Sequence, residues 1–305
     1  MEQTPNELYQ QIFEHLPLGI KIWRLDRRDD PGSLRLVASN QAAAEATGVP
    51  VAEVLGKPIA ESFPQAVPTG IAEAFAEVVR TGRMRDLGEV AYSDARVREG
   101  IYSVLAFPLP DDCVAVAFEN ITRRKLADVA HRRKDALERL RYSLLLAAHE
   151  AGGLEEACTR VMDLVCGSTG WPVGHVYQRS PEESLLVPTS LWHLRDPSQF
   201  QLFREVTEAT PLGFGIGLPG RVWASRRAEW IVDLTLDDNF PRARTVRHIG
   251  LRAGFAFPVT VGGEIEVVLE FYSPDSRVPD AELMEILEEN GRQLGRAVER
   301  ERVRR

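Results

Sequence analysis

The chain has 305 residues, of which 44% are hydrophobic and 27% charged, a composition typical of an ordinary globular protein of about two domains. Its 37 basic and 45 acidic residues leave a net charge of −8, so no global positive field attracts nucleic acid or anionic lipid, and we expect neither nucleic-acid binding nor membrane insertion. Cys113, Cys158 and Cys166 form neither a disulfide framework nor a metal-binding pair, and the absence of a signal peptide or a long apolar run predicts a reduced, cytoplasmic protein.

Residues 1–122 are predicted to form one domain. Apolar and polar residues alternate along the strand ranges, and the longer helical range is amphipathic and ends at Gly82. A turn over 29–32 joins the first two strands, and Asn40 caps the first helix. We expect strands over 19–25, 33–38, 87–93, 100–108 and 113–119, and helices over 41–46 and 68–80. This order is typical of an α+β fold with an antiparallel sheet and helices on one face.

A long helix is predicted over the linker, residues 123–148. The stretch from Arg123 to Arg141 carries eight basic and three acidic residues and no glycine or proline. Its apolar residues, and those of a C-terminal helix over 279–305, repeat with the a/d spacing of a coiled coil. The resulting dimer seam consists of Leu126, Ala130, Leu137, Leu140, Leu144, Leu283, Leu287, Asn290 and Leu294. Pairing of two chains and packing of each helix on its own domain both fit this pattern.

Residues 149–278 are predicted to form a second α+β domain. We expect strands over 173–178, 185–192, 229–233, 254–261 and 264–272, and helices over 154–166, 197–209, 218–225 and 241–249. The pair Gly262-Gly263 suits the positive φ angles of a tight hairpin. Glu264, Glu266 and Glu270 recur at period two along the last strand, where we expect them to be solvated.

Short motifs with fixed order mark both domains. In the first they are Leu16-Pro17-Leu18-Gly19-Ile20, Asn40-Gln41-Ala42-Ala43 with Thr47-Gly48, Val54-Leu55-Gly56-Lys57-Pro58, and Glu119-Asn120-Ile121-Thr122. In the second they are the run 215–223, Trp230 with Asp233, the runs 239–243, 250–251 and 256–259, and Val268-Leu269-Glu270-Phe271-Tyr272-Ser273. The first set resembles a PAS domain, except that Asn120 replaces the acid of the family's Asp-Ile-Thr junction. The second set resembles a GAF domain of bacterial sensor kinases.

These resemblances imply a sensor in signal transduction, such as a two-component system. Each family builds a small pocket and passes changes in it to flanking helices, often within a parallel dimer. The expected partners are therefore a second copy of the chain, a small-molecule ligand and an output domain. A histidine kinase is the expected output, and it lies outside this chain or on a partner, because no kinase, cyclase or helix-turn-helix motif is present.

Aromatic side chains are the candidate ligand contacts in the PAS-like domain: Trp23, Phe63, Phe75, Tyr102, Phe107 and Phe118. They could line an apolar pocket or simply form the core. The helical range 68–80 contains no histidine for a haem, and the helix after Asn40 lacks the cysteine of flavin photosensors. No particular cofactor is therefore indicated.

The candidate ligand contacts of the GAF-like domain are Trp192, His193, Phe214, Trp223, Trp230, His248, Phe255 and Phe257. Indole and imidazole groups could converge at one pocket mouth, or the tryptophans could fill the core while the histidines cap helices. Neither Cys158 nor Cys166 has the placement that a covalent bilin needs. We expect no metal site.

We find no catalytic set in the sequence and expect a protein that is not an enzyme. Two alternatives stay open. One is a structural module for dimerisation and protein interaction whose pockets are empty. The other is a GAF-type thiol reductase of methionine sulfoxide, which would need Cys158 or Cys166 exposed with a low pKa; their apolar neighbours on a predicted helix favour burial.

Overall fold

The computed structural model describes residues 4–180 and 182–304 and divides the chain into two compact units, Met1–His131 and Arg132–Arg305. Each unit is built on its own five-stranded antiparallel sheet. Helix α6 (Thr122–Glu150) contributes residues to both units. No helix within the described residues is long and apolar enough to cross a membrane.

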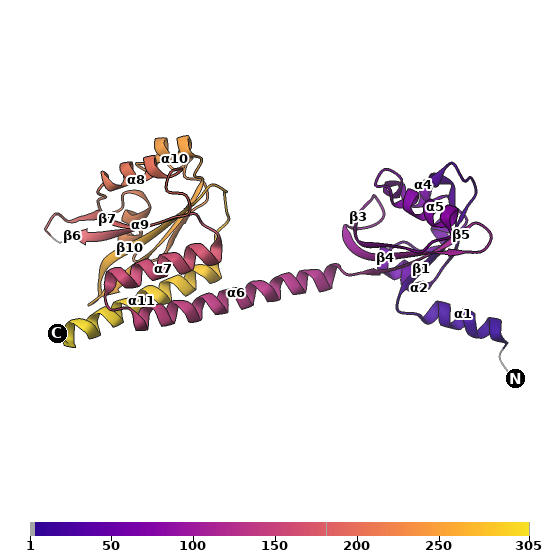
Figure 1. The fold of residues 1–305 in the computed structure, drawn as a ribbon, viewed down its shortest axis with the longest axis horizontal. Helices are drawn as coiled ribbons and strands as arrows, with labels where there is room; N and C mark the ends of the chain where they lie inside the picture. Colours follow the sequence, from indigo (N-terminus) through magenta and orange to yellow (C-terminus); the bar gives the residue numbers. More distant parts are fainter. Residues whose placement is uncertain (1–3, 181, 305) are drawn as a thin grey trace. The chain divides into compact units, whose positions relative to one another are not determined.

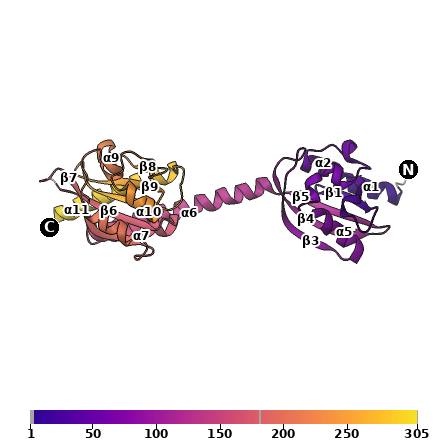
Figure 2. The same ribbon diagram turned by 90° about the horizontal axis from the view of Figure 1, so that it is seen from above.

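The N-terminal unit has the sheet order β2-β1-β5-β4-β3, with all neighbours antiparallel. Helix α5 packs across β3, β4 and β5 (Figures 1 and 2). Its strands are β1 (Gly19–Leu25), β2 (Leu34–Ser39), β3 (Arg85–Tyr92), β4 (Gly100–Leu109) and β5 (Cys113–Asn120). Its helices are α1 (Pro5–His15), α2 (Gln41–Thr47), α3 (Val51–Val54), α4 (Ile59–Ser62) and α5 (Ile71–Thr81), with 3-10 turns η1 (Pro31–Ser33) and η2 (Pro64–Ala66).

The C-terminal unit has the sheet order β7-β6-β10-β9-β8. Its strands are β6 (Val173–Ser180), β7 (Leu185–Leu194), β8 (Glu229–Ile231), β9 (Ala253–Val261) and β10 (Glu264–Ser273). Its helices besides α6 are α7 (Leu154–Thr169), α8 (Gln201–Glu208), α9 (Gly217–Ser225), α10 (Ala243–Ile249) and α11 (Ala281–Arg304). As expected, Gly262 and Gly263 make the β9–β10 turn with φ of 59° and 82°.

Two helical layers cover the C-terminal sheet. Helices α6, α7 and α11 lie on one face, and α8 and α10 lie on the other (Figure 1). Side chains of β9 alternate between the two, so that Phe255 and Phe257 pack under α7 and α11 while Ala256 packs on the α8 and α10 side. We call these the α11 face and the α10 face.

The seam residues predicted to join two chains are mostly buried inside one chain. On the α11 face, Leu137, Leu140 and Leu144 of α6 share one apolar core with residues of α7, α11 and the sheet. The same core takes Leu283, Leu287 and Leu294, and Asn290 donates a hydrogen bond from Nδ2 to the Leu144 carbonyl over 3.1 Å. Only Leu126 and Ala130 of the predicted seam are exposed. The a/d pattern therefore reflects packing of the two helices within their own unit.

Candidate functional site

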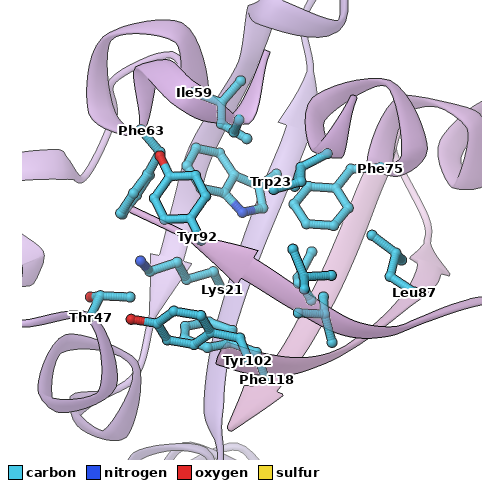
Figure 3. Close-up of a pocket in the computed structure, with 15 residues that line it drawn as sticks. Lys21, Trp23, Thr47, Ile59, Phe63, Phe75, Leu87, Tyr92, Tyr102 and Phe118 are labelled. Carbon is cyan, nitrogen blue, oxygen red and sulfur yellow. The ribbon is translucent and has the colours of Figure 1, made fainter. Parts of the chain in front are cut away.

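A cavity of about 90 Å³ lies between the sheet of the N-terminal unit and its helical segments (Figure 3). Its walls are Lys21, Trp23, Thr47, Ile59, Phe63, Ala66, Ile71, Phe75, Leu87, Val90, Tyr92, Tyr102, Val104, Val116 and Phe118. Five of the six aromatic residues expected to line a pocket here do so. Phe107 does not line it, although it lies on the same strand as Tyr102.

The alternation of β1 explains how the sheet side of this cavity is formed. In the segment Gly19–Leu25 every second residue is buried, so Lys21 faces the same side as Trp23 and Leu25. On the neighbouring strand β5, Val116 pairs with Lys21 and lines the cavity too. Sequence reasoning missed Lys21, although its parity with Trp23 marks it as facing inward.

Lys21 is the one cationic side chain of the cavity wall. Its side chain is buried, and Nζ lies 3.8 Å from the ring centre of Phe63 and 5.4 Å from that of Phe118. Burial lowers the pKa of the amine to about 7, because the charged form loses its hydration, while attraction to Asp94 partly opposes the shift. Close to neutral pH the cavity therefore switches between a neutral and a positively charged wall.

Asp94 is already engaged by other donors. It accepts the hydroxyl of Tyr92 over 2.5 Å and the backbone amides of Arg96 and Val97 over 2.8 Å each. Burial raises the pKa of the Asp94 carboxyl, but these hydrogen bonds outweigh it and leave the pKa below its usual value. No ion pair of Lys21 with a carboxylate is formed among the described residues.

A chain of hydrogen bonds runs from the cavity wall to the start of α6. Tyr102 donates its hydroxyl to the Ala46 carbonyl over 3.3 Å, and Asn120 donates Nδ2 to the same carbonyl over 3.4 Å. The Asn120 amide oxygen accepts the backbone N–H of Thr122 over 3.1 Å. Thr122 in turn accepts from the Ile101 amide on β4 over 2.8 Å. The residue that replaces the family's acid thus supports the first turn of α6 as an amide.

The residues expected to line a pocket in the C-terminal unit do not converge. Trp230, Phe255 and Phe257 belong to the α11 face, where Trp230 stacks on Phe255 at 5.3 Å. His193 lies beside α7, since its Nδ1 is 2.7 Å from Oδ1 of Asp163.

The other predicted contacts lie on the α10 face or in solvent. Trp192 and Trp223 pack at the edge of the core on the α10 face, and Trp192 donates its indole N–H to Glu208 over 3.0 Å. Phe214 and His248 are exposed. Their part in binding a ligand remains a prediction.

A buried ion pair lies on the α10 face of the sheet. Arg242 and Glu270 are both almost completely inaccessible, and the guanidinium donates to both carboxylate oxygens over 2.9 and 2.8 Å. Tyr272, Thr207 and His175 complete the polar cluster. Burial opposes ionisation of Glu270, but the contact with Arg242 outweighs it and holds the pKa at about 2. The expectation that Glu270 is solvated is therefore wrong, whereas Glu264 is exposed and paired with Arg179.

The two cysteines of the C-terminal unit are buried, as the sequence predicts. Cys158 and Cys166 lie on α7 in the core of the α11 face, each about 1% exposed. Burial raises the pKa of both thiols to about 12. No group of three or more metal-binding side chains is formed within the described residues.

Comparison with known proteins agrees with this architecture. A family model described as a PAS fold matches residues 13–126, and one described as a GAF domain matches residues 151–299. No curated protein matches the chain.

Several solved structures are similar to about half of this chain at low identity. A free methionine-R-sulfoxide reductase from Neisseria meningitidis in complex with its substrate is 15% identical with a TM-score of 0.46, covering 55% of this chain and 92% of that one. The GAF domain of an Acinetobacter phosphoenolpyruvate-protein phosphotransferase is 13% identical with a TM-score of 0.43, covering 56% and 96%. The corresponding domain from Coxiella burnetii is 15% identical with a TM-score of 0.45, covering 55% and 95%. With both family models matched in order along the sequence, the chain is a PAS domain followed by a GAF domain.

Proposed function

We propose that this protein is a signal-transduction sensor, not an enzyme, whose PAS cavity binds a small molecule and whose helix α6 reports whether the cavity is occupied. The observation that carries the proposal is the hydrogen-bond path from Tyr102 at the cavity wall through Asn120 to the first turn of α6. PAS and GAF domains are sensory modules, which supports the general class.

The mechanism requires a ligand that binds two arrangements of the path with different affinity. Tyr102 and Asn120 meet at one carbonyl, that of Ala46. A ligand that displaces the Tyr102 ring changes the sharing of this acceptor. Because the same Asn120 side chain holds the Thr122 amide, that change is passed to the start of α6.

The path is tested by hydrogen exchange in the first turn of α6, with 1-butanol as a neutral probe of the cavity. We expect butanol to alter exchange at residues 122–126 in the native protein. In Asn120→Ala we expect it to bind equally well but to leave exchange there unchanged. Asn120→Asp is the matched variant, because it keeps an oxygen for Thr122 but loses the donor to Ala46. An equal response in all three proteins would contradict the proposed path.

The output and the dimer belong to the same proposal. The resemblance to bacterial sensor kinases favours a histidine kinase as the domain that receives the signal. The exposed apolar residues of α6, among them Leu126, Val129 and Tyr142, favour pairing with a second copy along that helix. A native mass spectrum of freshly purified protein measures both subunit number and any retained ligand. A monomer would contradict the pairing.

A structural module with collapsed pockets is the second candidate, and the small size of the cavity favours it. It predicts that neither butanol nor any retained molecule occupies the PAS cavity. A changed chemical environment of Trp23 on addition of butanol would reject it.

The thiol reductase is the less favoured alternative. We expect Cys158 and Cys166 to react slowly with iodoacetamide in the folded protein, because burial keeps them protonated. The partly exposed Cys113 is the internal control and should be alkylated first. Rapid alkylation of either GAF cysteine, read by peptide mass spectrometry, would restore the reductase.

A further inference from the structure

We propose that the PAS cavity takes a short-chain aliphatic carboxylate, held by an ion pair between its carboxylate and the Lys21 amine. This inference rests on the proposed function and names the class of ligand. Apart from Lys21 and Thr47, the cavity is walled by apolar and aromatic side chains (Figure 3).

The charge of Lys21 is the first argument. A buried ammonium is costly unless an anion compensates it. The carboxylate that attracts the Lys21 charge is Asp94, whose oxygens are already engaged by Tyr92, Arg96 and Val97. Contact with the Phe63 ring compensates the charge only in part. An anion inside the cavity would complete the compensation.

The second argument is the kind of polar atom that the cavity offers. Tyr102, Thr47 and Tyr92 each donate their hydroxyl to a protein oxygen. The Lys21 ammonium and the Trp23 indole N–H donate to none of the described residues. Neither the charged ammonium nor the indole N–H can accept a hydrogen bond. The two donors left without a protein acceptor are therefore Lys21 and Trp23, and they call for acceptor atoms in the ligand. A carboxylate brings two.

Size and polarity restrict the rest of the ligand. The cavity of about 90 Å³ is smaller than the ~150 Å³ cavity that accepts benzene in a well-studied case. An aromatic acid is thus too large for this arrangement of the walls. An aliphatic tail of about two or three carbons beyond the carboxylate fits, and its methylenes would contact Ile59, Phe75 and Val116.

The inference predicts how binding depends on pH. The groups facing Lys21 are Asp94, which is ionised at neutral pH, and the phenols Tyr92 and Tyr102, whose pKa values burial raises. Lys21, with a pKa of about 7, is therefore the group that titrates near neutrality. Because only its charged form pairs with a carboxylate, affinity should fall about tenfold per pH unit above about pH 7.

The experiment uses the full chain labelled with 5-fluorotryptophan. Trp23 is the only tryptophan within residues 1–131, and the other four lie in the GAF domain as internal controls. The Trp23 fluorine resonance is titrated with butyrate and, at the same pH of about 6.5, with its neutral isosteres butyramide and 1-butanol. Acetate through hexanoate tests the length of the tail.

Two variants accompany the titrations. Lys21→Met keeps the length of the side chain but removes the amine, and Lys57→Met removes a lysine that lies on the surface of the same domain, paired with Glu61. We expect butyrate to bind at least about tenfold more tightly than butyramide in the native protein and in Lys57→Met. In Lys21→Met we expect this preference to be lost while butanol still binds.

Each outcome decides one point. Equal affinity for butyrate and butyramide, or a preference that survives in Lys21→Met, would overturn the carboxylate inference and leave the proposed function standing. A steady gain in affinity up to hexanoate would overturn the short tail. If none of the compounds moves the Trp23 resonance, both the inference and the proposed cavity sensor fail.

Discussion

The buried lysine of β1 affects stability as well as binding. Lys21 has a pKa of about 7 in the folded protein and 10.5 as its ordinary value, so between these values the unfolded chain holds more protons. Stability of the PAS domain therefore rises with pH across that window, and the full cost of the buried charge is present below about pH 7.

From this follows the first prediction. Lys21→Met should raise the free energy of unfolding at about pH 6 by on the order of 3 kcal/mol, and the gain should shrink toward about pH 10. Denaturant unfolding of the full chain at several pH values, followed at the Trp23 fluorine resonance, measures it. A gain independent of pH would mean that packing, not charge, is responsible.

Removing a charge from the buried ion pair in the GAF domain should have the opposite effect on stability. Glu270→Gln leaves Arg242 buried without a counter-charge and should destabilise the domain by about 3–5 kcal/mol. The double variant Arg242→Met with Glu270→Leu should recover most of this loss. In the native protein the contribution of Glu270 is present above its ordinary pKa and is lost as the pH falls from 4.5 toward about 2. Thermal unfolding of the two variants and of the native protein across this range tests both statements.

These two sites show what single residues reveal before a structure is known. Period-two alternation places Lys21 on the same face of β1 as Trp23, although a charged residue is not usually expected there. The same alternation predicts the wrong environment for Glu270. Its counter-charge is Arg242, which lies just before helix α10 and 28 residues earlier in the sequence. A buried ion pair depends on a tertiary contact that local sequence does not carry.

At the scale of elements, α6 shows how one pattern serves two purposes. Its buried stripe faces its own domain, while neighbouring residues face outward: Leu144 is 1% exposed and Leu145 is 45% exposed. Any pairing of two chains along α6 must therefore use the second set. The predicted seam residues pack within one chain instead of between two chains. The sequence does not distinguish these cases, because a heptad repeat looks the same whether the partner helix belongs to the same chain or another.

The adjacent residues make a matched pair of tests. Leu144→Asp puts a charge in the core and should destabilise the GAF domain by more than about 3 kcal/mol. Leu145→Asp should change stability by less than about 0.5 kcal/mol but weaken the dimer. Thermal unfolding and sedimentation velocity distinguish them. An unchanged dimer in Leu145→Asp would remove this stripe of α6 from the interface.

Most strands were predictable because alternation and turn residues are local signals. The first helix, α1, was missed although Thr4 and Glu7 form a capping box before an amphipathic stretch. The helix expected over 197–209 is shorter, Gln201–Glu208, since Asp196 binds the following amides in a turn.

For the whole molecule, separate apolar cores imply that the two domains unfold separately on heating. The apolar core of the PAS domain shares no residue with the two cores of the GAF domain. Calorimetry of the full chain should resolve two transitions, one moved by Lys21→Met and the other by Glu270→Gln. A single transition shifted by either variant would show that the domains unfold together.

The exposed middle of α6 has one more consequence. Every residue from Leu126 to Asp135 is exposed, so this stretch of α6 lacks the tertiary packing that gives most helices their stability. Arg132, Arg133 and Lys134 make it a substrate for trypsin whenever it unwinds. A partner helix would shield those peptide bonds. The rate at which trypsin cuts the chain between its two domains therefore measures how often this stretch of α6 unwinds.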